Sequence, residues 1–441
     1  MRITHVSLSP TEAAKSAARP ALTPELLAAV GARYSRSNDG LEAILAKIDP
    51  ENPDKSVDSI FKFVDYGHAS IADMAPVALF IDDISMWLAY ELFRLSPTSG
   101  GQESSTRYIR LDESGLLEPE ALGLPDAAGW REHMCAALSA YEEAVAFWEG
   151  VATREPERVR IPAGTPPKAV ARMHRNFAFD RARYFLPVAM RTNAMLVQSA
   201  RAWVGVCQSL LSSPLPEARH CGELIREELN LVAPRLLKHA RPLPSLEQGL
   251  ARELALASSS ELALSATERA AVATLDVFAP GGVDIAADLA FHDNRYSYVG
   301  EGLKRTAVRF AWDAVAFAEI RDLNRHRTGT KYCPPVPVGF YGALDQGGPE
   351  SLYIVGQEAT GRARKQLQAG DPTFVYELLL GTQFPFEHTT TADKFLYEAE
   401  LRTGVGAHYR YAQHLKDALA LWYEKYPETR GLVLEGSAEP E

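Results

Sequence analysis

The sequence has little cysteine, no long apolar run and no excess of basic residues. Only 4 of the 441 residues are cysteines, and none stands in a CxxC pair, so neither a disulfide framework nor a metal site of the zinc type is indicated. No window approaches the roughly 18 consecutive apolar residues of a membrane span. The N-terminus also lacks the apolar core of a signal peptide. We therefore expect reduced thiols, no membrane association and a cytoplasmic location.

The net charge of −11 argues against nucleic acid as a partner, because such binding depends on a basic surface that neutralises phosphates. Small anions remain possible ligands wherever arginines are concentrated locally. Hydrophobic residues make up 46% of the chain and charged residues 23%, as in an ordinary soluble globular protein.

Two common nucleotide-binding fingerprints are also missing. The sequence contains no GxxxxGK[ST], and its GxG at 404–406 is followed by Ala407, His408 and Tyr409, which breaks the dinucleotide-binding pattern. Rossmann-type and P-loop nucleotide binding therefore have no support.

What the sequence does contain is an approximate repeat. Residues 74–95 and 306–327 each begin with an apolar run of strand length, pass an acidic turn, and continue with helical apolar spacing that ends in arginine. Residues 182–206 and 381–405 form a second pair, with an aromatic residue, a proline, a polar stretch with threonine and a long helical pattern. Helix-like segments dominate elsewhere, so we expect a helix-rich α+β fold with a small sheet in each half.

The chain is too long for one ordinary core, which favours two domains. Residues 239–271 contain a proline break, a helical stretch and a serine cluster, typical of a linker. We place an N-terminal domain at 1–245, a linker with a helix at 246–280, and a C-terminal domain at 281–441.

Basic residues gather in a few short motifs. The stretch "DLNRHRTGTKYC" (322–333) contains an Arg-His-Arg triplet near the end of a helix-like run, where cations are favoured by the helix dipole alone. In "ESSTRY" (103–108) alternate residues would share one face of an extended backbone, which suits a phosphate. "DYGHASIAD" (65–73) places a histidine in a loop. Each motif alone is more simply a solvated surface or a capping turn.

Three arginines lie within apolar helical patterns, where an unpaired charge is costly. They are Arg183, Arg201 and Arg402. Each needs an internal carboxylate or a bound anion, and Glu398 and Glu400 are candidate partners for Arg402.

Taken together, the motifs resemble the flavin-dependent thymidylate synthase family, written twice. The family pattern is a GHxS-type loop, then RHRxxSxNExSxRY, then an ARxxLP…T…NAR…LR block. The matching segments are "GHASIAD" (67–73), "ESSTRY", "DRARYFLP" (180–187) and "SAR" (199–201) in the first half, and "NRHRTGT" (324–330), "FPFEHTTT" (384–391) and "LRTGVGAHYRY" (401–411) in the second.

Each half has lost what the other keeps. The first half reads "RLS" (94–96) at the RHR position, with an added residue or two before ExSxRY. The second half keeps RHR but continues with Lys331-Tyr332-Cys333. Arg183 is matched by Gly381, and the asparagine of the NAR motif is Ser199 in the first half and apparently Glu398 in the second. We therefore hypothesise composite sites built from both halves.

The resemblance implies an FAD-dependent enzyme that methylates dUMP reductively to dTMP, with methylenetetrahydrofolate and NADPH as co-substrates. It implies a homodimer of the tandem chain that imitates the family's tetramer. The roles carried over are catalysis for His68, Ser105 and Arg183; nucleotide binding for Glu103, Ser105, Arg107, Tyr108, Arg183 and Arg402; and flavin binding for His68, Arg201, Arg325, His326, Arg327 and Thr330.

Two rival interpretations remain. The first is a divergent flavoprotein that acts on another nucleotide, because the departures from the family pattern fall in binding motifs. The other is a non-catalytic nucleotide-binding or scaffold protein that keeps only the fold.

Overall fold

A computed structural model represents the chain, and it describes all residues except 39, 50, 65–68, 108, 110, 125, 261–268, 405 and 437–441. The residues group into two compact units. Unit 1 comprises Met1–Ser104, Leu117–Leu124 and Arg191–Glu253, and unit 2 comprises Ser105–Leu116, Pro125–Met190 and Leu254–Glu441. The predicted domains, 1–245 and 281–441 with a linker between them, stay a prediction beside this division.

Unit 1 is built on an antiparallel sheet with the strand order β1-β2-β4-β3. Its strands are β1 (Arg2–His5), β2 (Pro76–Ser85), β3 (Gly100–Glu103) and β4 (Arg191–Ser199). Its helices are α1 (Glu12–Ser16), α2 (Pro24–Tyr34), α3 (Leu41–Leu45), α4 (Pro53–Val64), α5 (Met86–Arg94), α6 (Pro119–Leu122), α9 (Ala200–Leu211) and α10 (Pro216–Val232). The helix α11 (Pro244–Ser258) contains residues of both units.

Unit 2 contains a second antiparallel sheet with the order β5-β6-β9-β7, and β8 pairs with β9. Its strands are β5 (Ala273–Phe278), β6 (Ala307–Ala316), β7 (Thr330–Tyr332), β8 (Gly339–Phe340) and β9 (Thr382–Thr391). Its helices are α7 (Ala127–Arg154), α8 (Pro167–Ala182), α12 (Ile285–Asp288), α13 (Glu301–Arg305), α14 (Phe317–Leu323), α15 (Glu350–Gln368), α16 (Ala392–Arg402) and α17 (Tyr409–Lys425). The helix-rich α+β class predicted from the sequence is confirmed.

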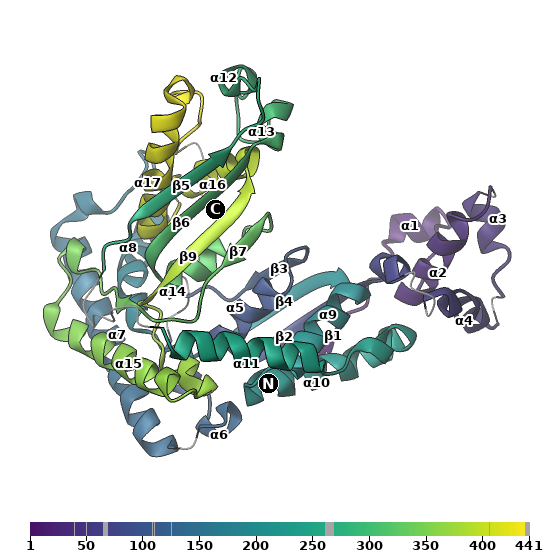
Figure 1. The fold of residues 1–441 in the computed structure, drawn as a ribbon, viewed down its shortest axis with the longest axis horizontal. Helices are drawn as coiled ribbons and strands as arrows, with labels where there is room; N and C mark the ends of the chain where they lie inside the picture. The colour runs from purple at the N-terminus through teal and green to yellow at the C-terminus, as the bar shows by residue number, and fades with distance from the viewer. Residues whose placement is uncertain are drawn as a thin grey trace. The chain divides into compact units, whose positions relative to one another are not determined.

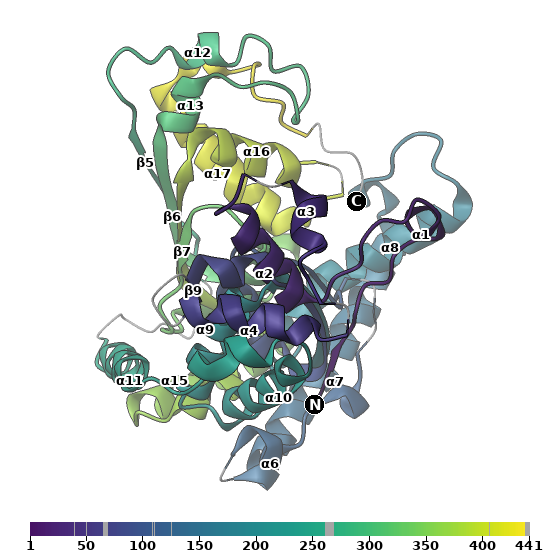
Figure 2. The same cartoon turned by 90° about the vertical axis from the view of Figure 1, so that its right-hand side faces the viewer.

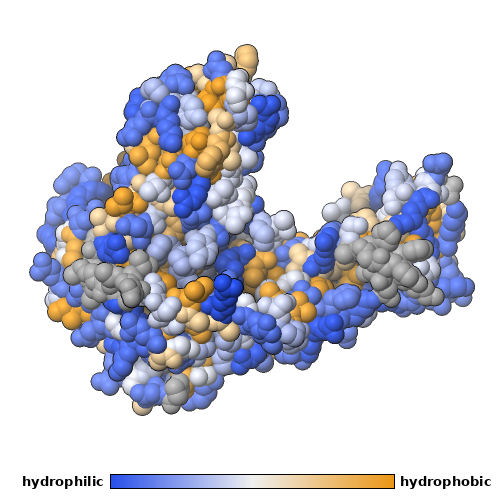
Figure 3. Space-filling model, viewed as in Figure 1, coloured by the Kyte–Doolittle hydropathy of each residue, from blue (hydrophilic) through white to orange (hydrophobic). Residues whose placement is uncertain are grey.

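Helices α16 and α17 pack on the sheet of unit 2, as Figures 1 and 2 show. Buried aromatic rings connect the sheet to α16 and α16 to α17. Phe310 of β6 lies 5.0 Å from Phe395 of α16, which lies 5.7 Å from Trp422 of α17, measured between ring centroids. Burial of such large aromatic surfaces is a main source of stability in a core. Apolar surface also remains visible on this unit in Figure 3, and Phe278 at the end of β5 is exposed.

In each sheet one long strand passes through a bulge and then leads directly into a helix. The pairing of β2 with β4 shifts between Ile81 and Ile84, and that of β6 with β9 shifts between Trp312 and Val315. Asp83, in the first bulge, has φ 57°, a left-handed conformation that aspartate tolerates better than most residues. The acidic turns predicted within residues 74–95 and 306–327 are therefore bulges, and the helices that follow them begin at Met86 and Phe317.

The second repeated block also differs from the expected long helix. Residues 191–199 and 382–391 are the strands β4 and β9, and helices follow only at Ala200 and Ala392. In β4 every second residue is buried, which is the periodicity of a strand with one covered face.

A candidate anion site in unit 2

Arg107 stands in the segment after β3, and its guanidinium is held on three sides. Its Nε and Nη2 donate to the two carboxylate oxygens of Asp180 at 2.7 and 3.0 Å. Its Nη1 donates to the carbonyl oxygen of Gly406 at 3.1 Å. Ser105 lies beside it, and its Oγ accepts the Arg107 backbone N–H at 3.2 Å. Burial disfavours the charged guanidinium, but the Asp180 carboxylate outweighs this effect and raises the pKa of Arg107.

His408 completes the surroundings of Asp180. Its Nε2 lies 3.0 Å from the Asp180 carbonyl oxygen and therefore donates, while its Nδ1 accepts the Arg410 backbone N–H at 3.3 Å. These two bonds fix a neutral tautomer. Burial lowers the pKa of His408 well below its usual value, and the cations of Arg183 and Arg107 lower it further.

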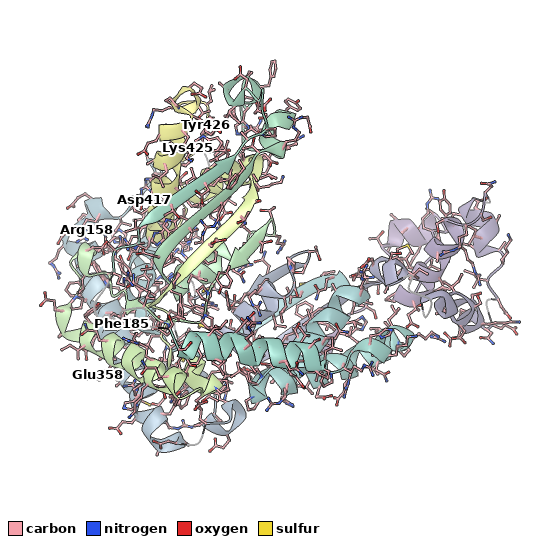
Figure 4. The ribbon with its side chains drawn as sticks, in the orientation of Figure 1. Arg158, Phe185, Glu358, Asp417, Lys425 and Tyr426 are labelled. Carbon is pink, nitrogen blue, oxygen red and sulfur yellow. The ribbon has the colours of Figure 1, made fainter. Side chains whose placement is uncertain are left out.

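Arg183 follows α8 and is almost fully buried. Its Nη2 donates to Asp322 at 3.1 Å and lies 3.9 Å from Glu319. Burial acts to raise the pKa of Asp322, but the Arg183 guanidinium outweighs it, so the pKa is lowered. At Glu319 burial wins and raises the pKa to about 7, although Arg183 and a hydrogen bond from Tyr184 of 2.8 Å oppose it. Phe185, labelled in Figure 4, packs its ring on Phe340 beside this cluster.

Arg402, at the end of α16, contacts the histidine of the Arg-His-Arg motif. Its Nε donates to His326 Nε2 at 2.8 Å, and its Nη1 donates to the Tyr411 hydroxyl at 3.3 Å. Burial lowers the pKa of His326 to about 3, so the imidazole is neutral and accepts this bond.

The three arginines share neighbours. Asp322, the partner of Arg183, also feels the charges of Arg402 and Arg107. Tyr411, which accepts from Arg402, also interacts electrostatically with Arg107. Unit 2 thus brings Arg107 and Arg183 from the first half of the sequence together with Arg402 and His326 from the second half.

Arg325, Arg327 and Thr330 lie on the loop between α14 and β7. Arg325 is half-buried and Arg327 is exposed, and burial together with the neighbouring Arg325 charge lowers the pKa of Arg327. Gly329 has φ 65°, and a Cβ there would lie 2.0 Å from the carbonyl oxygen of Thr389, so only glycine allows this turn. Thr330 then opens β7, opposite Thr389.

The remaining predicted residues are not part of this cluster. Glu103 belongs to unit 1, where it accepts from Thr192 Oγ1 at 3.4 Å. Arg201, also in unit 1, is half-exposed and pairs with Asp73 at 2.8 Å. His68 and Tyr108 lie outside the described residues. The assigned roles of all the site residues stay predictions.

Sequence reasoning missed Asp180, Asp322 and His408 as members of the cluster. Asp180 carried a usable signal, because it stands inside the apolar pattern "NFAFDRARYF" (176–185), where a carboxylate needs a cation just as the nearby arginines need anions. His408 gave no such signal, since its role follows from a tertiary contact.

The strand registers show which residues correspond between the two sheets. Ser199 pairs with the first residue of β2, and Thr391 pairs with the first residue of β6. Each ends its strand directly before a helix, so the counterpart of Ser199 is Thr391, and the match to Glu398 inferred from the sequence is wrong. The pairing of β7 with β9 ends at Tyr332, and one residue further along, Cys333 takes the place that Glu103 of β3 takes beside β4. Glu103 therefore corresponds to Cys333, as it does when the ESSTRY and RHR motifs are aligned with the family pattern.

Among the described residues, no helix is long and apolar enough to cross a membrane. In that same part of the chain, no cluster of three or more His, Cys, Asp or Glu residues is arranged to hold a metal ion.

Residues 21–235 match the family model described as thymidylate synthase complementing protein. This stretch of the chain is therefore similar to that family, as the motifs of the first half predict. No curated protein matches the chain.

Several solved structures are similar to the chain at low identity. One is the UMP/dUMP methylase PolB from Streptomyces cacaoi bound with 5-Br dUMP, with 15% identity, a TM-score of 0.32, and coverage of 54% of this chain and 93% of that one. Another is thymidylate synthase X from Helicobacter pylori with FAD and dUMP, with 14% identity, a TM-score of 0.35, and coverage of 54% and 99%. A second structure of that Helicobacter pylori enzyme has 13% identity, a TM-score of 0.36, and coverage of 55% and 100%.

Proposed function

We propose that this protein is an FAD-dependent thymidylate synthase that methylates dUMP reductively, using methylenetetrahydrofolate and NADPH. The observation that carries the proposal is the cluster of unit 2, where Arg107 and Arg183 of the first half share neighbours with Arg402 and His326 of the second half. Each of these residues matches a position of the family's motifs. The residues that each half has lost are supplied by the other half within one compact unit.

In this proposal the nucleotide phosphate is held by the hydroxyl of Ser105 and the guanidinium of Arg107. Arg183 and Arg402 bind the pyrimidine or its phosphate, and Glu103 and Tyr108 complete nucleotide binding. The protein supplies orientation and charge compensation, since bidentate guanidinium groups match the geometry of phosphate.

The Arg325–Thr330 loop fits a flavin diphosphate. Two arginines stand close enough for the charge of Arg325 to lower the pKa of Arg327, and a diphosphate would relieve that repulsion. Arg325, His326, Arg327 and Thr330 would hold FAD here, with His68 and Arg201 assigned to the same cofactor by their motifs. When bound, FAD supplies the hydride chemistry of the reaction.

A tandem duplication accounts for the two halves. Its support is the equal strand order of the two sheets and the equal position of their bulges. We propose that a homodimer of this chain takes the place of the family's tetramer.

One observation favours a second candidate function. The guanidinium of Arg107 is already engaged by Asp180 and Gly406, and that of Arg183 by Asp322. An anion bound there must compete with these carboxylates, which suits a divergent flavoprotein that acts on a less highly charged nucleotide.

The test is a single turnover. The purified protein is loaded with FAD, reduced without oxygen, and mixed with dUMP and methylenetetrahydrofolate, and the products are separated by chromatography. We expect dTMP. A yellow preparation that yields no dTMP would favour the divergent flavoprotein, and a preparation that binds no flavin would contradict both.

A further inference from the structure

A buried histidine and glutamate lie directly beneath the Arg325–Thr330 loop. His388 of β9 and Glu398 of α16 are 0% and 1% exposed, and His388 Nδ1 lies 3.1 Å from Glu398 Oε2. The ring of His388 is also packed on Phe310, with centroids 4.9 Å apart.

The other side of the imidazole determines its protonation. His388 Nε2 lies 2.7 Å from the carbonyl oxygen of Thr328, which can only accept, so Nε2 carries a proton. Its Nδ1 lies 3.1 Å from the Glu398 carboxylate without the geometry of a hydrogen bond, and among the described residues neither carboxylate oxygen of Glu398 has another hydrogen-bond partner.

The surrounding charges favour the ionised form of Glu398. Burial acts to raise the pKa of Glu398, but the basic groups around it, Lys331 among them, lower it to about 2. The carboxylate is therefore the ordinary state of this group at neutral pH, and a buried carboxylate requires a cationic partner.

The same cluster holds the backbone of the loop. Lys331 Nζ donates to the carbonyl oxygens of His326 and Thr328, the latter at 3.1 Å. Thr328 thus receives bonds from both Lys331 and His388. Glu398 Oε1 is 3.8 Å from His326 Nε2, which accepts from Arg402. The carbonyl groups of His326 and Thr328 are thus held by hydrogen bonds from Lys331 and His388. Arg325 and Arg327 belong to the same segment of the loop.

We infer that His388 and Lys331, with the carboxylate of Glu398 beside them, position the arginines of the Arg325–Thr330 loop for an anionic ligand. This inference rests on the proposed function, which names that ligand as a flavin diphosphate. His388, Glu398 and Lys331 are positioning residues, because they act through the loop backbone. Lys331 belongs to the segment that departs from the family's motif after Arg-His-Arg, and here it donates hydrogen bonds to the loop backbone.

The protonation of His388 can be tested without any ligand. The protein is labelled with 15N-histidine, and one-bond N–H couplings are recorded at pH 8, with His388→Gln used to assign the signal. We expect a proton on Nε2 of His388, the donor to the Thr328 carbonyl oxygen. A ring without an N–H at Nε2 would overturn that bond and with it the role of His388.

The positioning role is tested with a matched control. His292 and Glu400 form a second buried pair, with His292 Nε2 2.9 Å from Glu400 Oε1 on the same helix α16, and Glu400 also accepts the Leu434 backbone N–H. Glu398→Gln and Glu400→Gln therefore remove equivalent charges from one helix. We expect Glu398→Gln to weaken FAD binding about tenfold, and Glu400→Gln to change it less than about twofold.

Lys331 gives a second pair of variants that does not alter the core. Lys331→Met removes the donor and is expected to weaken FAD binding, whereas Lys331→Arg keeps a donor and restores most of it. Binding is measured from FAD fluorescence, and circular dichroism verifies folding. Equal effects of the Glu398 and Glu400 variants, or no effect of Lys331→Met, would overturn the positioning role. A wild-type protein that binds no FAD would overturn it together with the proposed function, while the NMR result decides the bond from His388 to Thr328 separately.

Discussion

At the scale of single residues, the buried arginines of unit 2 are compensated by the protein itself. The sequence left two explanations open for an arginine in an apolar pattern, an internal carboxylate or a bound anion. Arg107 has Asp180, and Arg183 has Asp322 at 3.1 Å. Such pairs contribute little net stability compared with apolar residues, but breaking one leaves an uncompensated buried charge.

The first prediction concerns the stability contributed by the Arg107–Asp180 pair. Asp180→Asn removes the carboxylate and leaves a mostly buried guanidinium without its partner, so we expect the free energy of unfolding to fall by about 3 kcal/mol. Urea denaturation measures this change. The control is Asp82→Asn, which breaks the exposed pair with Arg2 and should cost less than about 1 kcal/mol. Equal costs for the two variants would show that burial of the Arg107 pair has no energetic consequence.

The second prediction concerns Glu319 and the pH dependence of the free energy of unfolding. Its pKa in the folded protein is raised from 4.5 to about 7, so between these values the folded state holds more protons than the unfolded state. The stabilising contribution is complete below pH 4.5 and is lost as the pH rises through 7, by roughly 3 kcal/mol in total. Glu319→Gln cannot ionise.

Unfolding free energies of wild type and Glu319→Gln should therefore be compared at pH 5 and pH 8. We expect the wild type to lose more stability than the variant between these two values. The idea would be wrong if both proteins showed the same change, because Glu319 would then titrate alike in the folded and unfolded states.

At the scale of elements, the sequence predicted helices better than strands. The helix-rich α+β class expected from the dominant helix-like segments was correct. Strand β4 was missed because its alternate buried positions are filled by Ala194 and Leu196, whose preference for helix masks the period of two. Strand β9 contains Pro385, which normally argues against a central strand. Pro385 lies opposite the bulge of β6, between the pairs of Trp312 and Val315, where the regular ladder is interrupted.

The site was predicted in part for a similar reason. Arg107, Arg183, His326 and Arg402 were found because they stand in short motifs. Which of them meet could only be hypothesised, since the cluster depends on the packing of α8, α14, α16 and α17 in unit 2. The partners Asp180 and His408 are supplied by elements 228 residues apart in the chain, a relation that no local pattern records.

The bulge of β2 makes the third prediction. Asp83 has φ 57°, which a β-branched residue adopts at a cost of about 1–2 kcal/mol, whereas glycine adopts it freely. We expect Asp83→Val to be less stable than Asp83→Gly by that amount in thermal unfolding. Asp82→Val is the control, because Asp82 is outside the left-handed region. If Asp83→Val were as stable as Asp83→Gly, the bulge would not have the conformation described.

At the scale of the whole molecule, the two units repeat one architecture with different residues. The strand orders agree and the bulges agree. Each half of the sequence also keeps motifs that the other half has lost. The family match covers residues 21–235, which include the intact ESSTRY and ARYFLP segments. A duplicated enzyme that needs only some of its sites can lose motifs in this complementary way, and the proposal that one working site draws on both halves follows from it.

The most direct test of that claim is single-turnover formation of dTMP by the FAD-loaded protein and by the variants Arg107→Gln and Arg325→Gln, with Arg305→Gln in the exposed end of α13 as the control. Loss of one charge-assisted contact corresponds to a reduction between about 10-fold and about 100-fold. We predict a loss of this size for both Arg107→Gln and Arg325→Gln, and none for Arg305→Gln. A variant of either arginine that forms dTMP at the wild-type rate would contradict a single site built from both halves.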